Sequence, residues 1–165
     1  MKKSIVIALL LYVNIFAAPR VGDSAVEFDL PELYNQNKTL NSQALQGKVV
    51  LLNLWASWCS GCQEEMPLFV DLQEKYSKNN FVIVTSSIDN VAQSARDFLD
   101  RVDKEKQLVS LYDAKKILPK TYRCPGMPSS FLIDKSGTIS EVYVGSLDNK
   151  AMSELKVKID KLLGE

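Results

Sequence analysis

The chain of 165 residues carries 20 Lys and Arg against 20 Asp and Glu, so its formal net charge is zero, and 46% of its residues are hydrophobic. A chain of this length and composition can bury the core of a single domain. Balanced charge without a long basic block gives no electrostatic reason to expect a nucleic-acid partner.

The N-terminal segment has the layout of a secretory signal peptide. A basic start precedes an almost wholly apolar run at 5–16 and the small residues Ala17 and Ala18. This run is shorter than the roughly 20 residues that span a bilayer, although an uncleaved anchor is the alternative. We therefore predict a signal peptide at 1–18, followed by one mature domain at 19–165. Cleavage near the two alanines would leave that domain in the periplasm, without stable membrane insertion.

The first part of the mature domain predicts a small hairpin. Polar and apolar residues alternate at 26–30, turn-forming residues follow at 35–38, and a short second strand is expected at 39–40. One helical turn is predicted at 41–45, and Gly47 ends it.

The centre of the chain alternates strands and helices. A branched apolar run at 49–54 is too short for a helix and predicts a buried strand. Apolar residues spaced three and four apart then predict a helix that runs to about Lys78. The next elements are expected in the order strand 81–85, helix 91–102, strand 108–111 and a short helix at 114–118.

The last third predicts a hairpin and a covering helix. Strands at 131–134 and 138–144 are joined by a turn at 135–137. Asp148 is expected to cap a final helix, whose apolar stripe is Met152, Leu155, Ile159 and Leu162. Alternating units followed by a hairpin predict an α/β fold, with a mixed central sheet flanked by helices.

A Cys-x-x-Cys motif, Cys59 and Cys62, lies where the first core strand turns into a helix. A thiol at a helix N-terminus faces unpaired N–H groups and the positive end of the helix dipole, and both favour the reactive thiolate. Cys62 lies one turn on, on the same face and within reach of a disulfide bridge. Cys59 is therefore the expected nucleophile and Cys62 the resolving thiol.

Three other interpretations of the motif are weaker. A zinc site needs about four N or S ligands, and the sequence holds three cysteines and no histidine. Covalent haem attachment requires His after the second cysteine, where Gln63 stands. A purely structural disulfide remains an alternative, although so short a loop would stabilise the fold by only about 2 kcal/mol. Redox chemistry without a metal or a bound cofactor is favoured.

Several stretches together resemble the thioredoxin superfamily, and more closely its exported branch represented by TlpA, ResA and CcmG/DsbE. They are the run around the motif at 53–62, Glu65 after it, and residues 126–134. The resemblance covers nearly the whole mature domain and implies a thioredoxin-like fold with an N-terminal β-hairpin extension. It also implies a cis peptide between Met127 and Pro128, beside the disulfide, where substrate backbone is gripped.

Two positions depart from thioredoxin, whose buried Asp-Lys pair is replaced here by Asn53 and Thr85. Glu65 is left as the nearest acid. The resemblance to ResA-like proteins implies that Glu65 tunes the active-site thiols, because a buried carboxylate disfavours thiolate and exchanges protons. The alternative is a solvated acid on the helix face, like its neighbour Glu64.

Two tryptophans lie just before the motif, and a third cysteine precedes the loop that contains Pro128. Trp55 is expected in the core, whereas Trp58 is predicted to line the substrate surface, with core packing as the alternative. Cys124 stands four residues before Pro128. Two roles remain open for Cys124, a small core filler and a redox-active thiol.

The resemblance implies an exported thiol-disulfide oxidoreductase acting on protein substrates, and favours a reductase that serves cytochrome c maturation. Its implied partners are apocytochrome c and a thiol-reducing membrane electron donor. A general disulfide oxidase or isomerase is the alternative. A thiol peroxidase would have Thr or Ser at Ala56, and a copper-delivery metal chaperone would use a histidine, which the chain lacks.

Overall fold

The computed structural model describes residues 18–164, so the predicted signal peptide lies outside the described residues apart from Ala18. Within that range a mixed sheet is built from β3 (Val49–Trp55), β4 (Phe81–Ser87), β5 (Val109–Tyr112), β6 (Ser129–Ile133) and β7 (Ile139–Val144). Its strand order is β5-β4-β3-β6-β7. β3, β4 and β5 run parallel, whereas β6 is antiparallel to both β3 and β7. The predicted mixed α/β sheet is confirmed.

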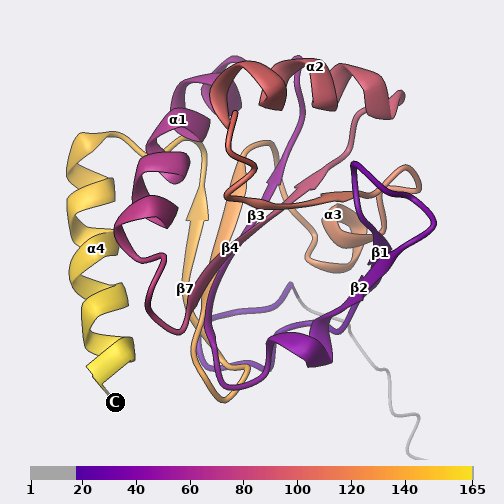
Figure 1. Cartoon of the computed structure of the whole chain (residues 1–165). Coiled ribbons are helices and arrows are strands. Elements are labelled where there is room, and N and C mark those ends of the chain that lie inside the picture. Colours follow the sequence, from indigo (N-terminus) through magenta and orange to yellow (C-terminus); the bar gives the residue numbers. More distant parts are fainter. Residues whose placement is uncertain (1–17, 165) are drawn as a thin grey trace, which may run out of the picture.

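Helices cover both faces of this sheet (Figure 1). They are α1 (Ser60–Lys75), α2 (Ala92–Val102), α3 (Ile117–Thr121) and α4 (Asn149–Gly164). β3, β4 and β5 follow one another in a single direction across the sheet, so right-handed crossovers place α1 and α2 on the same face. The buried side chains of α1, α2 and α4 accordingly form one hydrophobic cluster, and α3 contributes to a second. None of the helices within residues 18–164 is long and apolar enough to span a bilayer.

The predicted N-terminal hairpin is present as β1 (Asp29–Pro31) paired antiparallel with β2 (Thr39–Asn41). The helical turn expected after it is a 3-10 helix, η1 (Ser42–Leu45), which Asn41 caps by accepting the N–H of Gln43. Leu33 N–H donates to the carbonyl of Ser110 at 2.8 Å. The hairpin extension is therefore attached to β5 at the sheet edge.

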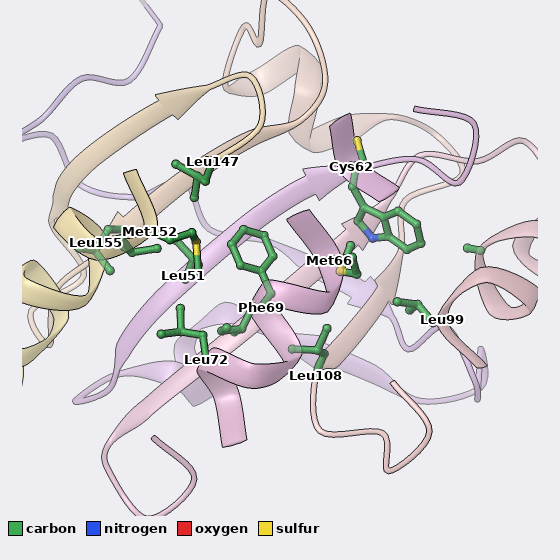
Figure 2. Close-up of a cluster of buried hydrophobic side chains, with 14 of the residues drawn as sticks. Leu51, Cys62, Met66, Phe69, Leu72, Leu99, Leu108, Leu147, Met152 and Leu155 are labelled. Carbon is green, nitrogen blue, oxygen red and sulfur yellow. The ribbon is translucent and has the colours of Figure 1, made fainter. Parts of the chain in front are cut away.

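The two core clusters follow from the side-chain alternation of β3. Most of its odd-numbered residues face α1, α2 and α4, and its even-numbered residues face α3 and the N-terminal segment. Figure 2 shows the first cluster, with Leu51 of β3 close to Phe69 of α1 and with Cys62 at its upper end. The motif therefore lies where the core meets the carboxyl end of β3.

Some predicted boundaries were wrong. β4 extends to Ser87 rather than ending at Thr85, because the polar residues there are fully buried and continue the pairing with β3 and β5. α3 begins at Ile117 rather than at 114, because the Asp113 carboxylate accepts the N–H groups of Ile117 and Leu118 and starts the helix there. α1 ends at Lys75, three residues before the predicted end.

The cap predicted for the last helix is confirmed. Asp148 Oδ1 accepts the N–H of Ala151 at 2.8 Å, and its backbone carbonyl accepts the N–H of Met152 at 2.9 Å. The helix buries the apolar stripe expected from the sequence, Met152, Leu155, Ile159 and Leu162.

Candidate active site

A disulfide joins Cys59 and Cys62 at the N-terminus of α1. Cys59 is the N-cap residue, with extended backbone, and its Sγ accepts the N–H of Cys62 at 3.3 Å. Cys59 is 8% exposed, whereas Cys62 is fully buried. Of the two cysteines, the one at the positive end of the helix dipole is therefore also the less buried.

The loop that contains Pro128 lies beside the motif. The Met127-Pro128 peptide is cis, as the resemblance implies. A Cβ atom on Gly61 would lie 3.5 Å from Cδ of Pro128 and 3.2 Å from Cβ of Ser146. Gly61, the second variable position of the motif, thus faces Pro128 and Ser146, and there is little room for a side chain at this position.

The two tryptophans have opposite environments. Trp55 is fully buried and its ring centroid lies 5.5 Å from that of Phe98 on α2, which confirms the expected core position. Trp58 is 65% exposed, so the alternative of core packing for this residue is wrong. Its side chain is largely in solvent, and the residue immediately precedes Cys59 in the chain.

Glu65 is buried, with 1% of its surface exposed, so the alternative of a solvated acid is wrong. Its Oε2 accepts the N–H of Leu147 at 3.0 Å, and its Oε1 accepts Nδ2 of Asn53 at 2.9 Å. Burial raises the pKa of Glu65 to about 7, although the hydrogen bonds from Leu147 and Asn53 oppose the rise. This carboxyl can therefore gain or lose a proton near neutral pH.

A buried row of neutral polar side chains crosses the sheet beside Glu65. Asn53 pairs in register with Thr85 of β4 and with Ser130 of β6, and its Nδ2 also donates to Ser130 Oγ at 2.9 Å. Thr85 Oγ1 donates to Ser110 Oγ at 3.3 Å. The two positions that the resemblance matches to the Asp-Lys pair of thioredoxin are therefore both neutral here, and Glu65 is the acid that contacts the first of them, Asn53.

Sequence reasoning missed Ser130 and Leu147 as partners of this network. Ser130 is placed by the antiparallel register between β3 and β6, and Leu147 by the loop between β7 and α4. The run Pro128-Ser129-Ser130 was a usable signal for Ser130, because the hydroxyl groups of consecutive serines in a buried strand need hydrogen-bond partners. No comparable signal existed for a backbone N–H.

Cys124 is half-buried and not disulfide-bonded. It packs against the cluster that contains α3, whereas Cys59 and Cys62 belong to the cluster on the opposite face of the sheet. Burial raises the pKa of the Cys124 thiol, and a hydrogen bond with Ser129 opposes the rise. Of the two roles left open for Cys124, these surroundings favour the core filler.

A pair of cysteines that interconverts between dithiol and disulfide carries two electrons without a bound cofactor. The pair lies at the start of the first α-helix of a thioredoxin-like fold. This position, together with the relatives described below, makes the protein a thiol-disulfide oxidoreductase. The chain belongs to the Redoxin family, whose model matches residues 20–159.

Two relatives and one solved structure agree with this assignment. The chain is 32% identical over 130 residues to the thiol-disulfide oxidoreductase ResA of Oceanobacillus iheyensis, covering 78% of this chain and 67% of ResA. It is 33% identical over 141 residues to the thioredoxin-like protein YneN of Bacillus subtilis, covering 84% of this chain and 79% of YneN. A crystal structure from Chlorobium tepidum, described as thiol:disulfide interchange protein DsbE, superposes with a TM-score of 0.80 at 32% identity, over 88% of this chain and 99% of that one. The resemblance and the thioredoxin-like fold expected from the sequence are confirmed.

Proposed function

We propose that the protein is a periplasmic protein-disulfide reductase in which Cys59 attacks and Cys62 resolves. The observation that carries the proposal is the asymmetry of the pair. Cys59 is 8% exposed at the N-terminus of α1, and Cys62 is fully buried behind it. Cys59 is therefore the more accessible of the two to a substrate disulfide, and the helix terminus stabilises its thiolate.

The reaction transfers two electrons in two exchange steps. The Cys59 thiolate attacks one sulfur of a substrate disulfide, so a bond forms between the two and the other substrate sulfur leaves as a thiolate. The Cys62 thiolate then attacks Cys59 Sγ and releases the second substrate thiolate. The substrate gains two electrons and the protein is left with the Cys59–Cys62 disulfide.

Glu65 is proposed as the group that exchanges protons with the buried thiol. Cys62 must lose its proton before it attacks, and it has no access to solvent. Glu65 stands three residues further along α1, and its pKa of about 7 makes it a proton acceptor at neutral pH. Its negative charge also disfavours thiolate in the resting dithiol.

The substrate is proposed to bind across the exposed Trp58 and the loop of Met127 and Pro128. Pro128 lies within reach of Gly61 in the motif, and Trp58 presents a large apolar surface next to Cys59. Extended substrate backbone beside the cis-proline loop would bring a disulfide to the exposed sulfur.

The reducing direction and the cellular role are proposed from the resemblance to the ResA and CcmG/DsbE branch and from the signal-like N-terminus. In that role, apocytochrome c thiols are the product and a thiol-reducing membrane protein supplies the electrons. A Cys-x-x-Cys-His segment is the sequence to which c-type haem attaches, so an oxidised peptide of that sequence is the simplest substrate that tests this role.

Mixing the reduced protein with one equivalent of such a peptide should convert most of the peptide to its dithiol. The peptide thiols can be counted by mass spectrometry after acid quenching and alkylation. The double variant Cys59→Ser/Cys62→Ser is the control and should yield no peptide dithiol. Oxidation of the reduced peptide by the oxidised protein, with no transfer in the other direction, would contradict the reductase assignment.

A further inference from the structure

We propose that Asp89 is a positioning residue for disulfide exchange, which holds Ser57 and thereby the turn that presents Cys59. Asp89 is 2% exposed and lies in the loop between β4 and α2. Ile88, just before it, donates its N–H to the carbonyl of Trp55 at the end of β3, at 2.9 Å. The inference rests on the proposed attack by Cys59 and holds for either direction of electron flow.

Three hydrogen bonds converge on the Asp89 carboxylate. Oδ1 accepts the hydroxyl of Ser57 at 2.7 Å, and Oδ2 accepts the N–H of Ser57 at 3.0 Å and the hydroxyl of Ser87 at 2.8 Å. Hydrogen bonds to an ionised acceptor are roughly twice as strong as those between neutral groups. The carboxylate therefore ties the loop that follows β3 to the rigid end of β4.

Ser57 is held from its other side as well. Its carbonyl accepts Nε2 of Gln63, in the first turn of α1, at 2.5 Å. The N–H, hydroxyl and carbonyl groups of Ser57 are thus all engaged. Trp58, which separates Ser57 from Cys59, is 65% exposed, so its side chain does not hold this segment by packing, although Ala56 and Cys59 are buried in the first cluster. Within the turn the Cys59 N–H donates to the Ala56 carbonyl at 3.2 Å, and the side-chain hydrogen bonds that tie the turn to the end of β4 run through Ser57.

This anchoring matters most when the protein is reduced. In the oxidised protein the disulfide itself restrains Cys59, whereas in the dithiol the bonds between Ser57 and Asp89 remain to hold the turn. Misplacing a reacting group by about 1 Å can slow a reaction about 100-fold. Without the anchor, Cys59 should gain more conformational freedom in the dithiol than in the disulfide, which still restrains it. The redox equilibrium should therefore shift towards the dithiol.

The test compares Asp89→Asn, Ser57→Ala and the double variant. Asp89→Asn should slow the exchange of the reduced protein with insulin about tenfold. It should also shift the equilibrium with glutathione about tenfold towards the dithiol, which corresponds to about 30 mV. Ser57→Ala should change both quantities in the same direction and by less, because it removes only the hydroxyl bond to Asp89 and keeps the backbone one. The double variant should differ little from Asp89→Asn, because the bond that Ser57→Ala removes is one that Asp89→Asn already disrupts.

Asp113→Asn is the matched control. Asp113 is 1% exposed and follows β5 at the same edge of the sheet, where its N–H donates to the Ser87 carbonyl. Its carboxylate accepts the N–H groups of Ile117 and Leu118 and so serves α3 rather than the motif. Asp113→Asn should lower the melting temperature and leave the exchange rate and the glutathione equilibrium unchanged.

Three results would overturn the inference. The first is an exchange rate and a glutathione equilibrium in Asp89→Asn equal to those of the wild type. The second is the same outcome in Ser57→Ala, and the third is a change in Asp113→Asn as large as that in Asp89→Asn. The Ser57→Ala variant keeps the carboxylate, so it tests the anchor even where Asp89→Asn does not fold. Full activity of Cys59→Ser would instead remove the proposed role of Cys59, which is a separate failure.

Discussion

Replacing Cys59 by serine should abolish disulfide exchange, whereas replacing Cys62 should leave a protein that captures substrates and does not release them. The different roles proposed for the two cysteines rest on the 8% exposure of Cys59 and the full burial of Cys62. Without the attacking thiolate no mixed disulfide forms. Without the resolving thiol the mixed disulfide at Cys59 persists, because nothing nearby expels the substrate.

Insulin reduction and non-reducing mass spectrometry measure the two effects. Cys59→Ser should reduce insulin at the uncatalysed rate, and Cys62→Ser should accumulate a covalent adduct whose mapped bond includes Cys59. Cys124→Ser is the matched control, since Cys124 packs on the other face of the sheet and should leave both results at wild-type values. Adducts that form through Cys62 in the Cys59→Ser variant would reverse the assignment.

Replacing Glu65 by glutamine should lower the pKa values of the thiols and slow substrate release. The substitution removes a buried negative charge that disfavours thiolate. It also removes the proposed proton acceptor for Cys62, and a positioned general base contributes about 100-fold or more to a rate. Release from a preformed mixed disulfide should therefore slow by about 100-fold at pH 8, while the pH dependence of alkylation moves to lower pH.

Glutamine is a suitable replacement because the surrounding groups can accommodate it. Its oxygen can accept the N–H of Leu147, and its amide can donate to Oδ1 of Asn53, which has no hydrogen-bond partner among the described residues. Asn53 reaches this arrangement by exchanging the positions of its amide oxygen and nitrogen. Thiol titrations and release rates equal to those of the wild type would leave Glu65 a purely structural acid.

The same carboxyl should make the stability of the oxidised protein depend on pH. Its pKa is about 7 in the fold against an ordinary value of 4.5, so between these values the folded state binds more protons than the unfolded state. The free energy of unfolding therefore falls as pH rises through this window. The pKa difference of about 2.5, at about 1.4 kcal/mol for each pH unit, corresponds to about 3.5 kcal/mol over the whole window. Urea titrations at pH 5 and pH 8 should show most of this loss in the wild type and none of it in Glu65→Gln.

The parts of the fold that could be predicted are those with a local signal. β3 and α4 are predictable because each is a continuous segment whose hydrophobic pattern matches its burial: a run of mostly apolar residues in β3 and one apolar stripe in α4. The predicted end of β4 comes two residues too early because the strand's last two residues are serines, which carry no hydrophobic signal. Pairing with β3 and β5 on both sides keeps them in the sheet. α3 was misplaced because the Asp113 carboxylate, and not the apolar pattern, decides where that helix starts.

The candidate site divides in the same way. The cysteine pair and its helix terminus were predictable because the motif, strand and helix are contiguous in the chain. Contacts across the fold were not, since Glu65 meets Asn53 and Leu147 through a helix lying over a strand and a loop 82 residues away. The anchoring of Ser57 by Asp89 likewise depends on the parallel register of β3 and β4.

The reduction potential of the Cys59–Cys62 pair decides most directly whether the protein is a reductase. The oxidised and reduced forms can be equilibrated with glutathione mixtures of known ratio and counted by alkylation and mass. We expect a potential well below the roughly −120 mV of strong disulfide-forming oxidants. A potential near that value would place the protein among the enzymes that introduce disulfides and would contradict the role proposed in cytochrome c maturation.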